Sequence, residues 1–462
     1  MALADQAVLI GGGYDLHSTQ AQIEKNVQWA RDSLESVGVS TTVYFSDGDD
    51  PADDVFYLAT DEEYHSPFEA MSRVYGEHTA NRLRYRGHSL ENVAGATNAE
   101  ALKNNLAQIL NEAEQSTLLV FNGHGSSSHD APHQVGISLW GNTSIKADEL
   151  QSVVRNATQP LRYVFTQCYS GGFNSMVFAN PAEGLELSKQ HICGVTSVSP
   201  YRKSEGCSAQ VSTNGYRDYT TYFFAALSGY DQKGEILSRE TDMDKDGLVS
   251  LREAHMYSVE TAVSTDIAYS SSDFYLERWE PWYLKWLPAR RSLPNNEFAK
   301  IFRSLATKHN MPLEGNAAKT IRSALRDATE NSEKLSELYH EIQEEEHKQQ
   351  QEIQLAVEAK WPALGQPYTD AFKTLVSGEN VAQISHWISQ HSVYAKLLAL
   401  QTRSSNLSND ILEAERYATQ LQKMLHMRKL ASLKQQLYQY GSFEEVAGYE
   451  RLLMCEKAPL SQ

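Results

Sequence analysis

The amino-acid sequence predicts an α/β fold with a mostly parallel sheet, followed by an all-helical C-terminal region. Two observations carry this prediction. Through about residue 285, short apolar runs typical of buried strands alternate with segments whose apolar residues recur at helical spacing. From about Asn296 onward the strand-like runs stop, and residues that favour helices dominate. Strands that alternate with helices are joined by crossovers, and crossover connections give parallel strands.

The expected strands are short and apolar throughout, as strands buried on both faces are. The first covers residues 7–10 and is closed by three glycines at 11–13. The others are expected at 41–45, 117–121, 161–165 and 192–198.

Amphipathic helices are expected between these strands. One is indicated by apolar residues spaced 4, 3, 4 and 3 apart and ended by Gly38, namely Ile23, Val27, Ala30, Leu34 and Val37. Thr97 and Glu100 are expected to form the capping box of a second helix. The apolar face of that helix would hold Leu102, Leu106 and Ile109.

Residues 46–96 interrupt the alternation and are expected to form a surface insertion. They contain five aspartates between Asp47 and Asp54, and an arginine at every second position from 82 to 86. We interpret both charge runs as solvated faces, with a role in recruiting substrate as the alternative.

A change of character after residue 288 predicts two domains, 1–288 and 289–462. In the second, residues 321–360 and about 410–440 have the composition and apolar spacing of two long helices. The segment between them contains prolines and glycines, so an antiparallel hairpin or bundle is expected. Such a domain could regulate the first, bind a protein partner or self-associate, and the sequence does not choose between these roles.

Composition argues against several classes of protein. The 462 residues include 41 Lys and Arg against 59 Asp and Glu, a net charge of −18. This balance disfavours nucleic acid as a partner, because binding a phosphate backbone needs clustered cations. No apolar run approaches the roughly 18 residues of a membrane span, so none is expected. The four cysteines are too few and too scattered for a disulfide framework.

The first residues leave two localisations open. Ala2-Leu3-Ala4 has the small-x-small form that signal peptidases cut after. A periplasmic or secreted protein is therefore one expectation. If the match arises by chance, a cytoplasmic protein is the other.

Two of the expected strands end in residues that suit nucleophilic catalysis. One leads to His124, which stands between Gly123 and Gly125, and another leads to Cys168. The carboxyl ends of neighbouring parallel strands meet at one edge of a sheet, so both side chains should lie there. An imidazole can accept a thiol proton and return it to a leaving amine. The N–H groups of Gly125 and Cys168 could form an oxyanion hole.

The two motifs together resemble the caspase–legumain group of cysteine peptidases. In that group a strand ending in His-Gly precedes a strand ending in Cys. The block 167–172, Gln-Cys-Tyr-Ser-Gly-Gly, looks most like bacterial legumain-like (C13-type) and metacaspase-like members. The resemblance covers about residues 5–285. It implies a three-layer α/β/α sandwich, a His124–Cys168 dyad without an organic cofactor, and hydrolysis of peptide bonds in proteins or peptides through an acyl-enzyme.

The resemblance also indicates where a P1 pocket would form: near 17–20, at Thr166, and along 199–218. Asp218, together with Glu205, would make this pocket acidic and favour Arg or Lys at P1, with Asn as the second choice. Caspases bind a P1 aspartate with arginine, and no arginine occurs between residues 11 and 29. Ordinary surface charge explains the two acidic residues equally well.

Residues 242–253 match the twelve-residue calcium loop of an EF-hand. Gly247 stands at the sharp turn, although a leading helix is doubtful because glycines lie close upstream. The expected ligands are Asp242, Asp244, Asp246, the Leu248 carbonyl, Ser250 and a bidentate Glu253. Four carboxylates drawn this close repel one another unless a cation sits among them, so we expect a structural Ca²⁺ site. A calcium-responsive interaction or scaffold protein with a peptidase-like fold is therefore the alternative function.

Overall fold

The computed structural model describes residues 6–60, 69–75, 82–128, 131–282, 293–367, 369–376 and 379–460. The Ala2-Leu3-Ala4 tripeptide and the expected boundary at residue 288 lie outside these residues. The chain forms two compact units. Unit 1 comprises Met1–Phe56, Tyr85–Leu325 and Thr419–Gln462, and unit 2 comprises Tyr57–Arg84 and Arg326–Ala418. This division differs from the expected one, because the end of the chain belongs to the unit that contains the sheet.

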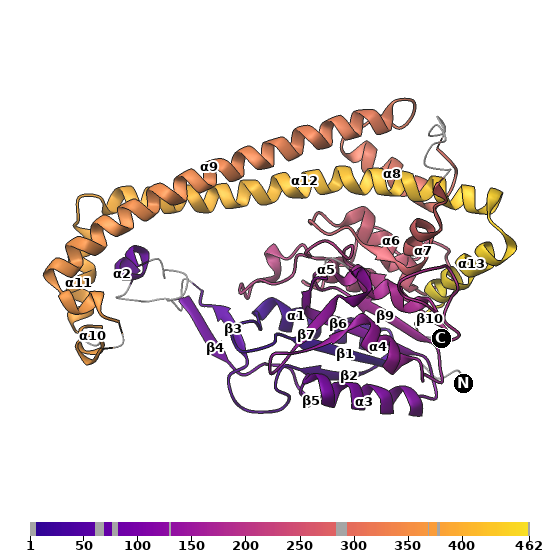
Figure 1. Cartoon of the computed structure of the whole chain (residues 1–462), viewed down its shortest axis with the longest axis horizontal. Helices are drawn as coiled ribbons and strands as arrows, with labels where there is room; N and C mark the ends of the chain where they lie inside the picture. Colours follow the sequence, from indigo (N-terminus) through magenta and orange to yellow (C-terminus); the bar gives the residue numbers. More distant parts are fainter. Residues whose placement is uncertain are drawn as a thin grey trace. The chain divides into compact units, whose positions relative to one another are not determined.

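Unit 1 is built on a mostly parallel sheet with the strand order β11-β10-β9-β6-β1-β2-β5 (Figure 1). All five expected strands are present: β1 (Gln6–Gly12), β2 (Ser40–Phe45), β6 (Thr117–Ser126), β9 (Leu161–Phe165) and β10 (Ile192–Thr196). They pair in parallel and their apolar side chains are buried, which confirms the α/β prediction. At the two edges lie β5 (Val93–Gly95), parallel to β2, and β11 (Tyr269–Ser270), antiparallel to β10.

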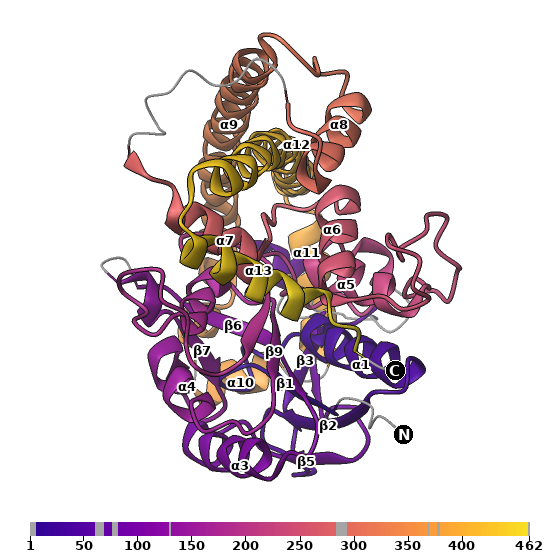
Figure 2. The ribbon, with the colours of Figure 1, turned by 90° about the vertical axis from the view of Figure 1, so that its right-hand side faces the viewer.

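Helices cover both faces of this sheet, as Figures 1 and 2 show. One face carries α1 (Ala21–Ser36), α5 (Tyr219–Ser228) and α6 (Leu251–Thr261), and the other carries α3 (Ala99–Glu112) and α4 (Ala147–Val154). The expected capping box of α3 is wrong in detail. Asn98 is the N-cap and accepts from the Glu100 N–H, whereas the Thr97 hydroxyl donates to the Ser46 carbonyl oxygen instead.

An antiparallel extension prolongs β6 beyond the sheet. β7 (Gly136–Leu139) pairs with the end of β6, and β8 (Thr143–Lys146) pairs with β7. The sequence analysis missed both strands. Their position matters because β7 holds the end of β6 that carries His124, which pairs with Ser138.

The last helix, α13 (Phe443–Lys457), packs in unit 1 against β10, α6 and α7 (Ser271–Trp279). Cys455 on this helix forms a disulfide with Cys193 on β10, across a sequence separation of 262 residues. The cysteine count gave no indication of this bond, because two cysteines so far apart carry no spacing signal. The helix is thus part of the sheet unit rather than of a separate C-terminal domain.

Unit 2 is helical, and its two long helices pack antiparallel, as predicted. They are α9 (Ala317–Lys360) and α12 (Tyr394–Tyr440), each of which has its other end in unit 1. Within unit 2, Lys396 pairs with Glu345 at 2.7 Å, and Ile342 packs against Leu400 and Leu407. Shorter helices also belong to the unit: α2 (Glu69–Val74), α10 (Asp370–Leu375) and α11 (Glu379–Ser389). The paired strands β3 (Val55–Leu58) and β4 (Leu83–Arg86) each lie partly in this unit.

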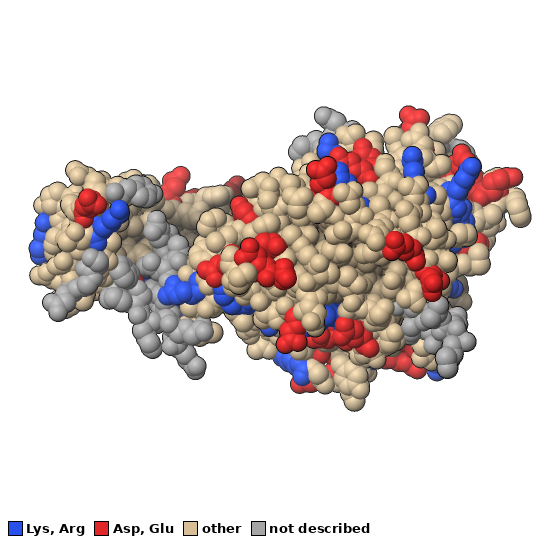
Figure 3. Space-filling view, turned by 90° about the horizontal axis from the view of Figure 1, so that it is seen from below, with Lys and Arg blue, Asp and Glu red and all other residues tan. Residues whose placement is uncertain are grey.

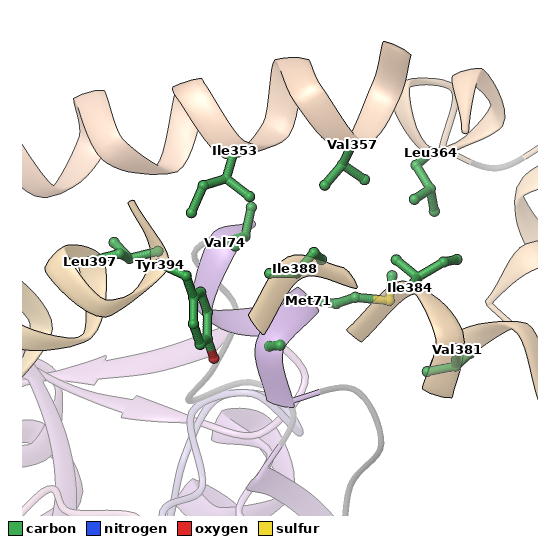
Figure 4. Close-up of a cluster of buried hydrophobic side chains, with 11 residues drawn as sticks. Met71, Val74, Ile353, Val357, Leu364, Val381, Ile384, Ile388, Tyr394 and Leu397 are labelled. Carbon is green, nitrogen blue, oxygen red and sulfur yellow. The ribbon is translucent and has the colours of Figure 1, made fainter. Parts of the chain in front are cut away.

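The expected surface insertion is partly a core element. Met71 and Val74 on α2 are buried among Ile353, Val357 and Ile388 (Figure 4). Residues 46–96 therefore contribute a helix to the core of unit 2, and the interpretation of this segment as a surface insertion is wrong there. Residues 46–96 are polar overall, so their composition did not indicate the short apolar face of this six-residue helix.

None of the helices in the described part of the chain has the length and apolarity of a membrane span. On the face shown in Figure 3, acidic side chains gather in several groups, in keeping with the net charge of −18.

Candidate active site

The two predicted catalytic residues follow neighbouring strands, β6 and β9. These strands pair in parallel up to Phe121 and Phe165, and His124 and Cys168 each stand three residues further along. The backbones at Gly125 and Cys168 lie so close that only glycine fits at 125, because a Cβ there would lie 2.1 Å from the Cys168 carbonyl oxygen. The sequence thus brings both residues to one edge of the sheet, as expected.

The imidazole of His124 is held in one tautomer. Its Nε2 lies 2.7 Å from the Ser18 carbonyl oxygen and 2.9 Å from Gln20 Oε1. Both partners are acceptors, so Nε2 carries the proton and Nδ1 is left with its lone pair. Gly13 makes this contact possible, because a Cβ there would lie 2.4 Å from the Ser18 carbonyl carbon.

Burial also keeps His124 neutral. Desolvation lowers the pKa of His124 below its ordinary value of 6.5, although the Ser18 carbonyl and the charge of Asp15 act in the opposite direction. A neutral imidazole with a free Nδ1 can accept a proton from a thiol.

The half-buried thiol of Cys168 is contacted by the loop that follows β10. Its Sγ accepts from the Ser204 N–H at 3.3 Å and lies 3.9 Å from the Ser204 carbonyl oxygen. Among the hydrogen bonds of the described residues, none joins Cys168 to His124, and none uses the Cys168 N–H. That N–H is therefore available to a substrate carbonyl, as an oxyanion hole requires.

A second thiol, which the sequence analysis did not assign to the site, lies beside His124. Cys207 Sγ is 3.9 Å from His124 Nδ1, so its S–H can donate to that nitrogen. Cys207 is an exposed residue. Desolvation of its thiol, followed by the electrostatic effects of Cys168, Asp218 and Asp266, raises the pKa of Cys207 to about 12.

Asp218 does not face an open pocket. It is only 2% exposed, and its carboxylate accepts from Gln22 Nε2 at 3.0 Å, Asn26 Nδ2 at 2.9 Å and the Thr221 hydroxyl at 2.8 Å. Burial raises the pKa of Asp218, and hydrogen bonds that include those from Thr221 and Gln22 partly offset that rise. Its role as a direct ligand of a P1 side chain is thus corrected: Asp218 braces α1 and the start of α5.

Glu205 is tied to a buried carboxylate that the sequence did not single out. The Glu205 N–H donates to Asp266 Oδ1 at 2.9 Å, and Glu205 Oε2 accepts from the Thr265 N–H at 2.8 Å. Asp266 Oδ2 accepts from the Tyr219 N–H. Burial, followed by the charges of Glu205 and Asp218, raises the pKa of Asp266 to about 8, and buried Lys423 lies within electrostatic reach.

The side chain of Thr166 joins the ends of β6 and β9 by hydrogen bonds. Its hydroxyl donates to the Phe121 carbonyl oxygen and accepts from Asn122 Nδ2 at 2.8 Å. Its carbonyl oxygen accepts from the Ser204 hydroxyl at 2.9 Å. Thr166 therefore supports the loop that contacts Cys168 rather than lining a pocket with its own side chain.

Hydrogen bonds between its own residues hold the acidic loop 242–253. Carboxylate oxygens of Asp242, Asp244 and Glu253 lie within 4.8 Å of one another. Asp242 Oδ2 accepts from the Gly247 N–H at 2.9 Å, and Gly247 has a φ of 91° that favours glycine. Three of the expected ligands thus converge, and their oxygen donors suit a hard cation.

The remaining expected ligands are placed less directly. Asp246 Oδ1 accepts from the Leu248 N–H, and the Ser250 hydroxyl donates to Glu253 Oε2 at 2.8 Å. Ser250 and Glu253 also form the capping box of α6, so Glu253 serves the helix as well as the loop. No helix leads into the loop in the described chain, since α5 ends at Ser228, which confirms the doubt about a full EF-hand.

The aspartate run at 47–54 is not simply a solvated face. Asp54 is fully buried and pairs with His88 at 3.0 Å, while Asp47 lies close to both. Burial and then the charge of Asp54 raise the pKa of Asp47 to about 6. The arginine run is similar, because Arg86 pairs with fully buried Glu24 at 2.6 Å.

Comparisons with known proteins leave the family open. No protein-family model matches the chain, and no curated protein matches it. Among solved structures, it is similar to Raptor from Chaetomium thermophilum, with 9% sequence identity and a TM-score of 0.30. The match covers 98% of this chain and 38% of the Raptor chain, so this chain spans well under half of that protein. A likeness this weak carries no argument about function.

Proposed function

We propose that this protein is a cysteine endopeptidase, with Cys168 as the nucleophile and His124 as the general acid and base. One observation carries the proposal: the tautomer of His124 is set by two acceptors, and its free Nδ1 faces the loop that contacts Cys168. A half-buried histidine with a purely structural role does not need its unprotonated nitrogen beside a free thiol and next to the loop that contacts a second one.

The proposed reaction follows from these groups. His124 Nδ1 accepts the Cys168 proton as the sulfur attacks the substrate carbonyl carbon, and the N–H of Cys168, with that of Gly125, stabilises the oxyanion. The protonated Nδ1 then gives its proton to the leaving amine, and water hydrolyses the acyl-enzyme. Nδ1 has one lone pair, so it cannot accept from Cys207 and Cys168 at the same time. Substrate binding must therefore displace the Cys207 S–H before Nδ1 can accept the Cys168 proton.

A covalent probe tests the proposal. A peptide acyloxymethyl ketone is expected to label the wild-type chain and Cys207→Ala at one residue, Cys168, and not to label Cys168→Ala. Cys207→Ala is the matched control, because it removes the other free thiol from the same site. Labelling that persists in Cys168→Ala would contradict the peptidase proposal.

We further propose that the preferred P1 residue is Arg or Lys, with Asn as the second choice. Asp15 acts electrostatically on His124, and Asp218 and Asp266 act on the neighbouring Cys207, so negative charge lies near the site. A cationic P1 side chain would offset the cost of burying these groups.

The P1 proposal predicts a charge-dependent change in selectivity. Asp15→Asn is expected to lower kcat/KM for a P1-Arg peptide about tenfold relative to a P1-Asn peptide, because it removes a charge that acts on His124 and retains the shape. A fluorogenic library with varied P1 residues measures this ratio. A wild-type profile dominated by P1 Asp would contradict it.

The lowered pKa of His124 predicts the acid side of the pH profile. The base must be unprotonated, so kcat/KM should fall as the pH drops through the pKa of His124, with a midpoint below the ordinary 6.5. The Gln20→Ala variant, which removes one of the two acceptors at Nε2, should reduce kcat/KM and shift this midpoint, whereas a merely structural Gln20 would leave the midpoint in place. Initial rates between pH 4 and 8, roughly the range over which histidine titrates, provide the measurement.

We also propose that residues 242–253 bind Ca²⁺ in a structural role. Adding Ca²⁺ to metal-free protein is expected to raise the melting temperature, with a stabilisation of about 2.7 kcal/mol when the concentration is about 100 times Kd. A lone loop binds weakly, so a Kd of roughly micromolar or poorer is expected. Asp242→Asn is a cleaner control than Glu253→Ala, because Glu253 also caps α6. No heat and no change in melting temperature at about millimolar Ca²⁺ would contradict the site.

The loop also motivates the second candidate, a calcium-responsive interaction protein that uses its helices to bind a partner. The covalent probe separates the two proposals, because this candidate needs no reactive Cys168. Its own test is calcium-dependent self-association or partner binding of the full chain.

A further inference from the structure

The four residues from Ser204 to Cys207 contact both members of the catalytic pair. The Ser204 N–H donates to Cys168 Sγ, and Cys207 Sγ lies 3.9 Å from His124 Nδ1. Cys168 and Cys207 are the two free cysteines of the chain, since Cys193 and Cys455 are joined. Both free thiols therefore lie at one short segment, and they are close enough to act on each other electrostatically.

The backbone on either side of Cys207 is anchored. The Glu205 N–H donates to buried Asp266, and Ser208 exchanges two hydrogen bonds with Gln22, at 2.9 and 3.0 Å. Gly206 between these anchors has a φ of 125°, and a Cβ on it would lie 3.3 Å from Asp218 Cβ. The backbone at Cys207 is thus fixed by its neighbours. Its sulfur can still move by rotation about the Cα–Cβ bond.

We propose that Cys207 is a redox modification site, whose thiol forms a reversible disulfide with Cys168 after a peroxide has oxidised Cys168. The loss of activity that this bond would cause rests on the proposed peptidase function, whereas the bond itself does not. The disulfide occupies the nucleophile and protects it from irreversible oxidation.

The chemistry balances with peroxide as the oxidant. His124 Nδ1 accepts the Cys168 proton, the thiolate attacks one peroxide oxygen, and the O–O bond breaks. Cys168 becomes a sulfenic acid, and the leaving hydroxide takes the proton from His124 and departs as water. His124 Nδ1 accepts the proton of Cys207, and the resulting thiolate attacks the Cys168 sulfur. The S–S bond forms, the S–O bond breaks, and the second oxygen leaves as water. Two thiols lose two electrons in total, and one peroxide becomes two waters.

The environment of Cys207 favours this order of events. With a pKa raised to about 12, Cys207 stays a thiol and reacts poorly with peroxide by itself. It becomes a nucleophile when the imidazole beside it accepts the proton. The Ser204 N–H, in contrast, would stabilise negative charge that develops on the Cys168 sulfur.

Mass spectrometry of the full-length protein tests the proposal. The chain is treated with hydrogen peroxide, blocked with iodoacetamide and digested without reduction. A peptide pair that joins Cys168 to Cys207 is expected, and dithiothreitol should remove it. The Cys193–Cys455 pair provides an internal reference for intact disulfides in the same digest.

Two variants sharpen the test. In Cys207→Ser, Cys168 lacks its partner and should proceed to the sulfinic and sulfonic acids; after dithiothreitol its probe labelling, relative to its own untreated level, should recover about fivefold less than in wild type. Cys168→Ser should give no joined peptide and little oxidation of Cys207. If wild-type Cys168 is over-oxidised while Cys207 stays free, the proposal is overturned.

The readout separates this proposal from the peptidase proposal. A joined peptide in a protein that hydrolyses no substrate would support the modification site and argue against the enzyme. Protein that hydrolyses a substrate but forms no joined peptide would support the enzyme and argue against the modification site.

Discussion

Replacing Cys168 or His124 with alanine is expected to reduce kcat/KM by about 10⁴-fold or more, because a nucleophile and its base act as one unit. The double variant should be little worse than either single variant, since the second substitution removes a group that no longer has a partner. Initial rates on a fluorogenic peptide measure the loss. Both side chains are only half-buried at the sheet edge, so the melting temperature should change little.

A variant at the neighbouring thiol separates the roles of the two cysteines. Cys207→Ala should retain measurable hydrolysis, because it leaves the nucleophile and the base in place. Residual activity above about a tenth in His124→Ala would contradict the role given to the imidazole. Activity that disappeared in Cys207→Ala and persisted in Cys168→Ala would exchange the roles of the two thiols.

Glu456→Ala is expected to reduce the free energy of unfolding by about 3–5 kcal/mol, the cost of breaking a buried ion pair on one side. Glu456 lies fully buried on α13 and accepts from Ser271 Oγ at 2.7 Å, Ser272 N at 2.6 Å and Ser272 Oγ at 2.7 Å. It also lies 3.3 Å from Arg252, which has a second partner in Asp273. Alanine would leave the serine donors unpaired and a buried guanidinium with one fewer carboxylate.

Glu456→Gln is the matched control for this variant. It keeps the shape of the side chain and part of the hydrogen bonding, so its loss should be clearly smaller than that of Glu456→Ala. Urea unfolding with the disulfide intact provides both values. Equal and small losses in the two variants would show that α13 contributes little to the stability of unit 1.

The same network changes the expectation for a shortened chain. A chain that ends near residue 288 lacks α13, and with it Glu456 and Cys455. Such a chain should fold poorly rather than act as a free peptidase domain. Removing the C-terminal half is therefore a poor test of regulation, and the sequence-based idea of a separable domain from 289 to 462 does not take this packing into account.

Local signals in the sequence were sufficient for the central sheet and for the placement of His124 and Cys168 after two neighbouring strands. Apolar runs predicted the five parallel strands, because strands buried on both faces leave few polar positions. His124 and Cys168 could be singled out since each follows such a run beside a glycine. The proposed calcium loop could be singled out for a similar reason, because the ligands of such a loop occupy fixed positions within twelve residues.

Features that depend on distant parts of the chain were not predictable in the same way. Gln20 and Ser18 hold His124 across more than 100 residues of sequence. Asp266 meets Glu205 across 61 positions, and no local pattern marks it as part of the site. Asp218 was predicted to line a pocket from its charge alone. In the structure it is buried and accepts hydrogen bonds from Gln22 and Asn26 on α1, which the sequence did not reveal.

The Cys193–Cys455 bond closes the chain between these residues into a covalent ring. A peptide-bond cut at any position from 194 to 454 would leave one molecule with two chains, held together until the disulfide is reduced. Self-processing or nicking in that range would not change the apparent mass on a non-reducing gel, and two fragments would appear only after reduction. A single band on a non-reducing gel is therefore no evidence that the backbone is intact.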